Sequence, residues 1–196
     1  ILDDDIDKAW KDLDEYLSER GINLDVCSPN ISNRELYRFT TEELFEHEMD
    51  DMNLPGWSNN FIYDEFHPDP VYDNSRMVEQ NLFRDIFCKR DLFYEIEYDK
   101  EDIVFNNKLY ETRESFIEMI NRFKSAFDEI ELIEFSIANC DVKETESTVT
   151  GNYRAVAKSG INETVFKGDF KVEMILNDMD YWYFKKIQID EFAPDL

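Results

Sequence analysis

The carboxy-terminal two thirds of the sequence, residues 73–192, predict an α+β domain in which two or three helices pack on a curved antiparallel sheet. Patterns typical of helices come first along the chain and four strand patterns follow, which is the order of an α+β domain. The strand over residues 163–176 is the clearest, because apolar residues from Phe166 to Leu176 alternate with charged ones. Residues 1–72 predict a mostly helical or irregular acidic extension.

Within the extension, an amphipathic helix is predicted over residues 3–20, because apolar residues recur there at intervals of three and four. A short helix is predicted over residues 41–50, since Thr40 and Glu43 have the spacing of a capping box. Residues 22–39 are expected to be irregular. A proline-containing linker is expected to end the extension.

The domain over residues 73–196 is expected to open with a helix that Asn74 or Ser75 caps and that ends near Phe87. A short helical turn over 91–96 and a hairpin across Asn106-Asn107 come next, because asparagine tolerates the positive φ of a tight turn. The last predicted elements are one helix and four strands, over residues 113–127, 130–142, 147–158, 163–176 and 181–189.

Charge is the most extreme feature of the composition, with a formal net charge of −25. Residues 1–72 hold 19 Asp or Glu against 5 Lys or Arg, and residues 73–196 hold 27 against 16, so the net charges are −14 and −11. Such a field repels phosphate backbones and anionic lipid and favours basic partners. We expect protein partners with a basic surface and neither direct nucleic-acid binding nor membrane binding. Solubility alone is an equally good explanation of the charge.

Three cysteines, Cys27, Cys88 and Cys140, have neither close pairing nor the spacing of metal ligands. A sparse, odd count suits a reducing compartment. The sequence has no apolar run long enough to cross a membrane and no leader pattern. We therefore expect an intracellular protein, cytoplasmic or nuclear, without a metal or another cofactor.

The order of elements resembles the nuclear transport factor two-like family, also called SnoaL-like. The segments that carry the resemblance are residues 81–92, residues 102–105, residues 113–117 and the last strand around Trp182. The resemblance covers about 115 to 120 residues and leaves residues 1–72 outside it. It implies a cone, in which the helices cover the concave face of a strongly curved antiparallel sheet.

The family contains both enzymes and binding modules, so the site has to decide the function. In the ketosteroid-isomerase-like members, a tyrosine stabilises the oxyanion and an aspartate abstracts the proton. The resemblance places Phe83 at the position of the tyrosine and Asn107 at that of the base, and neither can perform that chemistry. The two histidines, His47 and His67, both precede the predicted cone. These observations predict no catalytic residues and no enzymatic activity.

The candidate binding residues are aromatic and apolar. The last strand is aromatic on both faces from Tyr181 to Phe184, which indicates a second layer over the sheet. That layer could be a homodimer or heterodimer partner, or residues 40–70 of the same chain. The amphipathic helix needs a groove, in its own chain or in a partner. The predicted partner-binding residues are Trp10, Leu13, Tyr16, Leu17, Trp57, Tyr181 and Tyr183. The predicted cavity-lining residues are Phe83, Phe87, Phe116, Glu134, Phe170 and Trp182.

The leading hypothesis is a non-enzymatic, protein-binding adaptor, and the resemblance suggests a setting in ribonucleoprotein assembly or nuclear transport through protein contacts. The alternative is a small-molecule-binding protein, or an isomerase or dehydratase of the SnoaL-like kind, that uses the cavity of the cone. An open cavity with a buried carboxylate would favour the alternative. A cavity filled by aromatic rings would favour the adaptor.

Overall fold

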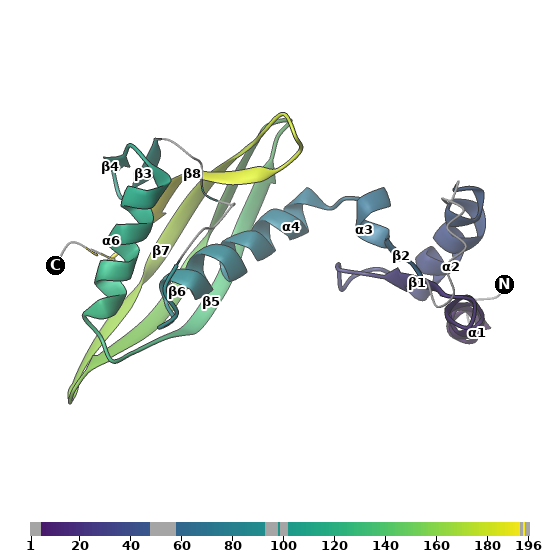
Figure 1. Cartoon of the computed structure of the whole chain (residues 1–196), viewed down its shortest axis with the longest axis horizontal. Coiled ribbons are helices and arrows are strands. Elements are labelled where there is room, and N and C mark those ends of the chain that lie inside the picture. Colours follow the sequence, from purple (N-terminus) through teal and green to yellow (C-terminus); the bar gives the residue numbers. More distant parts are fainter. Residues whose placement is uncertain (1–4, 48–57, 93–97, 99–101, 193, 195–196) are drawn as a thin grey trace. The chain divides into compact units, whose positions relative to one another are not determined.

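The structure, a computed structural model, describes residues 5–47, 58–92, 98, 102–192 and 194. The chain divides into two compact units, Ile1–Asp69 and Pro70–Leu196 (Figure 1). The division lies in a proline-rich segment, three residues before the boundary expected after residue 72. In the part of the chain that the structure describes, no helix combines the length and apolar character needed to cross a membrane.

The carboxy-terminal unit is built on a six-stranded sheet with the strand order β4-β3-β8-β7-β6-β5. All neighbouring strands are antiparallel except β3 and β8. The four long strands confirm the predicted meander. Their bounds, with those of the short strands β3 and β4, are Ile103–Phe105, Lys108–Tyr110, Glu129–Val142, Glu146–Ser159, Asn162–Leu176 and Trp182–Ile189.

Two local predictions within this unit are confirmed. Asn106 and Asn107 form the β3–β4 turn with positive φ angles of 46° and 65°. The helix α6, Arg113–Ser125, begins where the Thr112 hydroxyl accepts a hydrogen bond from the Ser115 backbone N–H at 3.2 Å. That bond satisfies one of the amide groups left unpaired at the start of a helix.

The first helix of this unit differs from its prediction. It begins at Pro70, before the expected caps Asn74 and Ser75, as α4, Pro70–Met77. Proline suits the first position of a helix, since the N–H that it lacks has no helical partner there. A π-helical segment, Val78–Phe83, and a final turn α5, Arg84–Ile86, follow. The helical turn predicted over 91–96 falls mostly outside the described residues, and Asp91 and Leu92 are not helical.

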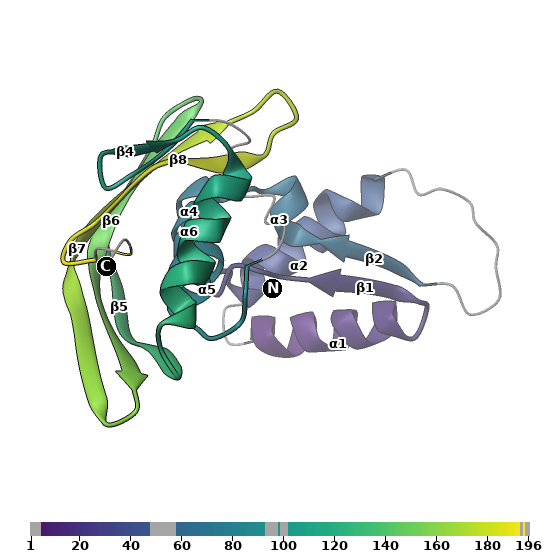
Figure 2. The same ribbon diagram turned by 60° about the vertical axis from the view of Figure 1, so that its left-hand side comes forward.

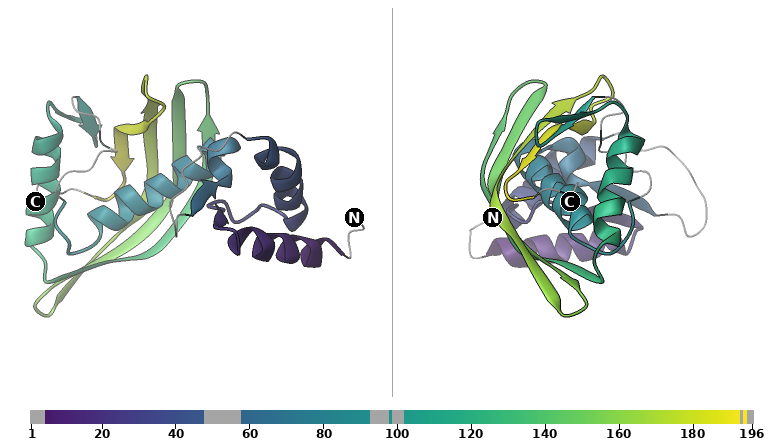
Figure 3. Two further views of the ribbon diagram at one scale, coloured as in Figure 1. Left: turned by 45° about the vertical axis from the view of Figure 1, so that its right-hand side comes forward. Right: turned by 90° about the vertical axis from the view of Figure 1, so that its left-hand side faces the viewer.

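The sheet curves around the helices, which lie on its concave face (Figures 2 and 3). The pairing of β5 with β6 shifts register between Leu132 and Glu134 and again between Ile137 and Asn139. Each shift adds a residue to β5, and such bulges bend a strand and increase its twist. The predicted fold class is therefore confirmed for the carboxy-terminal unit: helices cover the concave face of a strongly curved antiparallel sheet.

Aromatic rings fill the space between the helices and the sheet. The Phe83 ring centroid lies 4.6 Å from that of Phe170, 5.0 Å from Phe135 and 5.3 Å from Tyr153. Phe87 stacks on Tyr153 at 5.3 Å. Close ring pairs of this kind add to the stabilisation from burial alone.

The amino-terminal unit is more regular than expected. A parallel pair of strands, β1 (Ile22–Asp25) and β2 (Asn59–Ile62), joins two segments far apart in the sequence. The helix α1 (Ile6–Ser18) confirms the amphipathic prediction over its described part and contacts the helix α2 (Asn33–Glu42). Two short helices, η2 (Leu44–Glu46) and α3 (Tyr63–Phe66), complete the unit.

Two predictions for the amino-terminal unit are wrong. Residues 22–39 are not irregular, since they hold β1 and most of α2. The helix predicted over 41–50 is replaced by the end of α2 and the single turn of η2, and residues 48–50 lie outside the described part. The capping residue is Ser32, whose hydroxyl accepts from the Glu35 N–H at 3.2 Å. This Ser-x-x-Glu pair competes with the Thr-x-x-Glu pair eight residues later, and the earlier pair begins the helix.

Replacing Phe83 by alanine should destabilise the carboxy-terminal unit by about 3–5 kcal/mol, because the ring is fully buried and the cavity left behind cannot close. Urea denaturation of the full chain, followed by circular dichroism, measures the change. Phe45→Ala is the matched control, since Phe45 is 85% exposed and should change stability little. Equal stability of Phe83→Ala and the unchanged chain would mean that the cone is not packed around this ring.

Candidate functional site

The interior of the cone is packed, so most residues predicted to line a cavity belong to the core. Phe83, Phe87, Phe116 and Phe170 are each no more than 4% exposed. They contact one another or other aromatic rings instead of an open space. Of the predicted set, Trp182 borders a cavity beside the beginning of β8, and Glu134 borders another cavity that Arg84 also lines.

Glu134, predicted to line the cavity, does not reach the interior. Its carboxylate is exposed and lies 3.6 Å from the Arg154 guanidinium on the neighbouring strand. A bulge next to Glu134 shifts the alternation of β5, which the sequence pattern could not show. Tyr153, on the neighbouring strand β6, is buried and donates a hydrogen bond from its hydroxyl to the Asp190 carbonyl at 2.7 Å. Burial raises the pKa of Tyr153, so this hydroxyl stays protonated.

Lys124 is a buried cation of the cone. It is 1% exposed, and its ammonium donates to the Arg90 carbonyl at 2.6 Å. Burial lowers its pKa, and the neighbouring Cys88 and Asp85 oppose that shift. This hydrogen bond holds the segment that follows α5, so the observed role of the Lys124 ammonium is to stabilise the fold.

An apolar groove lies within the amino-terminal unit. Its volume is about 540 Å³, and α1, α2, η2 and both strands contribute to its walls. Leu13, Tyr16 and Leu17 of α1 form one wall, and Leu44 and Phe45 belong to the opposite side. We call this feature the amino-terminal groove. None of the residues of α1 is fully buried, so this helix keeps apolar surface available.

Of the predicted partner-binding residues in this unit, three line the amino-terminal groove: Leu13, Tyr16 and Leu17. Trp10 instead packs against the small core formed by residues of α2, η2 and α3. Trp57 lies outside the described residues. Phe45 was not among the predicted candidates, although it is 85% exposed and lines the groove.

A cluster of charged side chains lies along α2 and extends to His67. The Arg38 guanidinium lies 2.6 Å from the Glu35 carboxylate and 2.8 Å from that of Glu43, and His67 Nε2 lies 2.7 Å from Glu43. The hydrogen bond from Arg38 holds the pKa of Glu35 below its usual range. Desolvation alone would raise the pKa of Glu43, but the hydrogen bonds from His67 and Arg38 outweigh it and lower that pKa.

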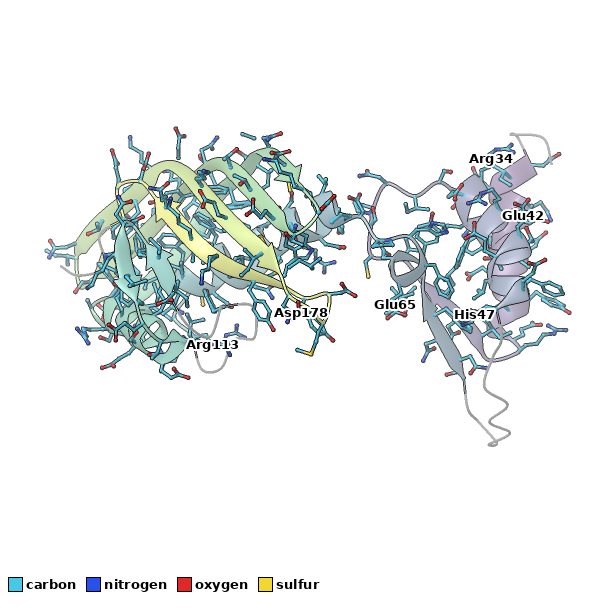
Figure 4. The ribbon with its side chains drawn as sticks, turned by 90° about the horizontal axis from the view of Figure 1, so that it is seen from above. Arg34, Glu42, His47, Glu65, Arg113 and Asp178 are labelled. Carbon is cyan, nitrogen blue, oxygen red and sulfur yellow. The ribbon has the colours of Figure 1, made fainter. Side chains whose placement is uncertain are left out.

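A second cavity, which we call the β8 pocket, lies in the carboxy-terminal unit and has a volume of about 700 Å³. One wall comes from the helix that begins at Pro70, and the other comes from residues 179–183 at the start of β8. Figure 4 marks Asp178 in the turn that leads into this strand. Tyr181, Trp182 and Tyr183 follow one another along this wall.

The β8 pocket borders an unsatisfied amide. Asn74 is fully buried, and its Oδ1 and Nδ2 atoms have no hydrogen-bond partner among the described residues. Leaving such a group unpaired costs about 1–3 kcal/mol. The sequence predicted Asn74 as a possible helix cap. The same local pattern fits a cap and a residue inside the first turns of a helix, so it could not show that Asn74 is buried.

A bulge follows the aromatic start of β8. Glu173 pairs with Lys186 and Met174 with Phe184, so β8 holds an extra residue between these pairs. As a result Phe184 and Ile187, three positions apart, both lie in the core. Tyr181 is 58% exposed, and Trp182 and Tyr183 are half-buried. A homodimer or heterodimer through this face stays a prediction.

Metal ligands do not converge in the described part of either unit. No group of three or more His, Cys, Asp or Glu side chains there is arranged to hold a metal ion. The three cysteines are free thiols.

Neither the family models nor the curated proteins contain a match to this sequence. Solved structures do match. A nuclear transport factor 2-like superfamily protein from Salmonella enterica serovar Typhimurium is 10% identical, with a TM-score of 0.45 over 62% of this chain and 90% of that one. A protein from Kribbella flavida is 12% identical, with a TM-score of 0.45 over 60% and 90%. These likenesses concern the fold alone.

The prediction that the chain is not an enzyme is wrong as an inference from this fold. The matched structures include a proposed dehydratase of the nuclear transport factor 2-like family from Streptomyces avermitilis. It is 7% identical, with a TM-score of 0.39 over 47% of this chain and 68% of that one. No activity follows for the present chain from that likeness.

The amino-terminal unit should lose stability in acid, because the pKa values of Glu35 and Glu43 are lowered in the folded chain. A folded pKa below the unfolded value contributes stability above the unfolded pKa, about 4.3 for glutamate, and that stability is lost as the pH falls through the folded value. The pKa of Glu35 is lowered in this way. Glu35→Gln should therefore reduce the fall in melting temperature between about pH 5 and pH 3, as measured by scanning calorimetry.

Glu65→Gln is the control for this prediction. Glu65 is an exposed residue of α3, and its replacement should leave the full acid dependence in place. Identical pH profiles for the two variants would contradict the role of the Arg38 cluster.

Proposed function

We propose that this chain is a protein-binding module whose amino-terminal groove takes up an amphipathic helix with a basic polar face from another protein. The single observation that supports this most directly is the groove itself, with the apolar side chains of α1 on one wall and the exposed Phe45 ring at the other. An amphipathic helix laid in an apolar groove is a recurrent mode of peptide recognition.

Charge selects the kind of helix. Residues 1–72 carry a net charge of −14, so a basic segment is attracted over distances of about 10 Å at moderate salt, and an acidic one is repelled. Arg20 is the arginine of the groove wall, and its guanidinium stacks 3.4 Å above the Tyr16 ring centroid. The other residues that line the groove are mostly apolar, and none of those described is acidic.

A groove of this kind needs a partner with spaced apolar anchors. Leu13 and Leu17 are four residues apart on α1, one turn of helix, and Tyr16 extends the same stripe. A partner helix with apolar residues at i, i+3, i+4 and i+7 would place its side chains against this stripe and against Leu44. The cytoplasmic or nuclear setting, and a place in ribonucleoprotein assembly or nuclear transport, belong to this proposal as predictions.

The test uses a synthetic amphipathic helix with leucine on one face and lysine on the other, titrated into the full chain and followed by fluorescence anisotropy. We expect saturable binding that weakens as salt is raised, because exposed charges are screened. Phe45→Asp should raise the dissociation constant at least tenfold, about 1.4 kcal/mol. Because Phe45 is exposed, this change should leave the melting temperature unaltered.

Two controls make the result specific. Ile161→Asp changes a fully exposed apolar residue in the β6–β7 turn and should leave binding unchanged. A peptide with glutamate in place of lysine should bind roughly tenfold more weakly or worse, because the acidic unit repels it. Equal affinity of Phe45→Asp and Ile161→Asp, or of the two peptides, would contradict the proposal.

A further inference from the structure

Aromatic and acidic side chains meet in the β8 pocket. Three consecutive aromatic residues, 181–183, line the pocket at the start of β8, directly after Asp180, which lines it too. Asp73 and Met77 line it from α4. Because these two residues are four positions apart, about one turn of helix, they lie on the same face of α4. The pocket therefore combines aromatic rings, a thioether and two carboxylates.

The groups that line the β8 pocket have accessible surface. Both carboxylates and Tyr181 are exposed, and Trp182 and Tyr183 are half-buried. The Asn74 amide, whose polar atoms are buried, takes no part in binding. The volume of about 700 Å³ lies within the range of small-molecule sites, roughly 300–1,000 Å³. A small molecule can therefore contact acidic and aromatic surface together.

A defined turn holds the aromatic wall in place. The Asn177 Oδ1 atom accepts hydrogen bonds from the backbone N–H groups of Met179 and Tyr181 at 3.0 and 2.8 Å. The Asn177 side-chain amide also donates to the Tyr183 hydroxyl at 3.3 Å. Asp180 takes a positive φ of 61° within the turn. These contacts fix the backbone that carries the wall, which lowers the cost of ordering it around a ligand.

Charge favours a cation in this pocket. Asp73 and Asp180 line it together with Arg76, so carboxylates outnumber cations among its described residues, and residues 73–196 carry a net charge of −11. An anion would enter against this field, whereas a cation is attracted by it. Aromatic rings act in the same direction, because the face of a ring is the negative part of its quadrupole.

The apolar part of the lining favours a cation without hydrogen-bond donors. A primary ammonium loses hydrogen bonds to water when it enters such a site, and each lost bond has to be replaced. A quaternary ammonium has no N–H group, so it has none to replace. Its methyl groups can contact the aromatic rings and the Met77 thioether.

We infer that the β8 pocket binds a small molecule that carries a quaternary ammonium group. The methyl groups of the ammonium lie against the aromatic wall of β8, and the carboxylates of Asp73 and Asp180 balance its charge. The site belongs to the carboxy-terminal unit and lies outside the packed interior around Phe83. It therefore does not depend on the helix proposed to bind in the amino-terminal groove.

The probes are choline and 3,3-dimethylbutan-1-ol, which has the same shape and hydroxyl group but a carbon atom in place of the charged nitrogen. Titration of the full chain, followed by NMR through the indole N–H signal of Trp182, measures both dissociation constants. We expect choline to bind roughly fivefold more tightly, or better, and to bind less tightly as salt is raised. Equal binding of the two probes, or no shift of the Trp182 signal with choline, would overturn the inference.

Tyr181→Leu removes a ring from the pocket and keeps an apolar side chain. Choline should bind roughly fivefold more weakly, and 3,3-dimethylbutan-1-ol should bind almost as before, because only the cation is attracted by the ring quadrupole. Tyr16→Leu is the matched control, since Tyr16 of α1 is 53% exposed and Tyr181 is 58% exposed. The same choline affinity in both variants would contradict the inference.

Asp180→Asn removes a carboxylate and keeps the turn, because asparagine tolerates a positive φ. Choline should bind roughly threefold more weakly, and the neutral probe should be unaffected. Asp169→Asn removes the same charge from an exposed position of β7 and should leave choline binding unchanged. If both variants bind choline equally, the pocket carboxylates do not hold the cation and the inference fails.

Discussion

The packing of Phe83 into the cone determines where this protein can bind anything else. The ring lies between the first helix of the carboxy-terminal unit and the sheet, within 4.6–5.3 Å of Phe170, Phe135 and Tyr153. A curved sheet with a helix across its concave face encloses a volume, and that volume must hold either a ligand or side chains, because empty space forfeits dispersion contacts. Here side chains occupy it.

Both candidate sites therefore lie outside the packed interior of the cone. The amino-terminal groove uses apolar side chains that the small core of its unit leaves half-exposed. The β8 pocket lies beside the helix that leads to Phe83, at the end that holds Asn74. The π-helical segment, Val78–Phe83, follows that end. Its wider turn changes the direction of the side chains along the helix, so that Leu82 and Phe83 can both be buried. The same run of helix thus contributes to a packed core and to a pocket wall.

Much of the carboxy-terminal unit could be predicted because its signals are local. Alternation defines β7, the two asparagines define the β3–β4 turn, and Thr112 begins α6. The bulges of β5 and β8 could not be predicted, since an extra residue appears only when two strands pair. For that reason Glu134 was expected inside the cone, where it does not lie.

The amino-terminal unit was harder to predict because its strands are short and distant. β1 and β2 have four residues each, and their pairing joins Ile22 to Asn59 without any local signature. Two capping pairs compete for the start of α2, and only the packing of Leu36 and Phe39 favours the earlier one. In the candidate sites, Leu13 and Leu17 followed from helical periodicity. Phe45 and Asn74 did not, because the exposure of one and the missing partners of the other depend on tertiary packing.

Methyl-resolved NMR of the full chain, labelled at isoleucine and leucine, gives the most direct test of the central claim that binding occurs outside a packed cone. The basic amphipathic peptide should shift the methyl signals of Leu13, Leu17, Ile22 and Leu44, which line the amino-terminal groove. It should leave unchanged those of Leu82, Ile86 and Ile120, which are fully buried in the cone. Shifts confined to Leu82, Ile86 and Ile120, with the groove signals unmoved, would show that the cone opens to bind and would contradict the claim.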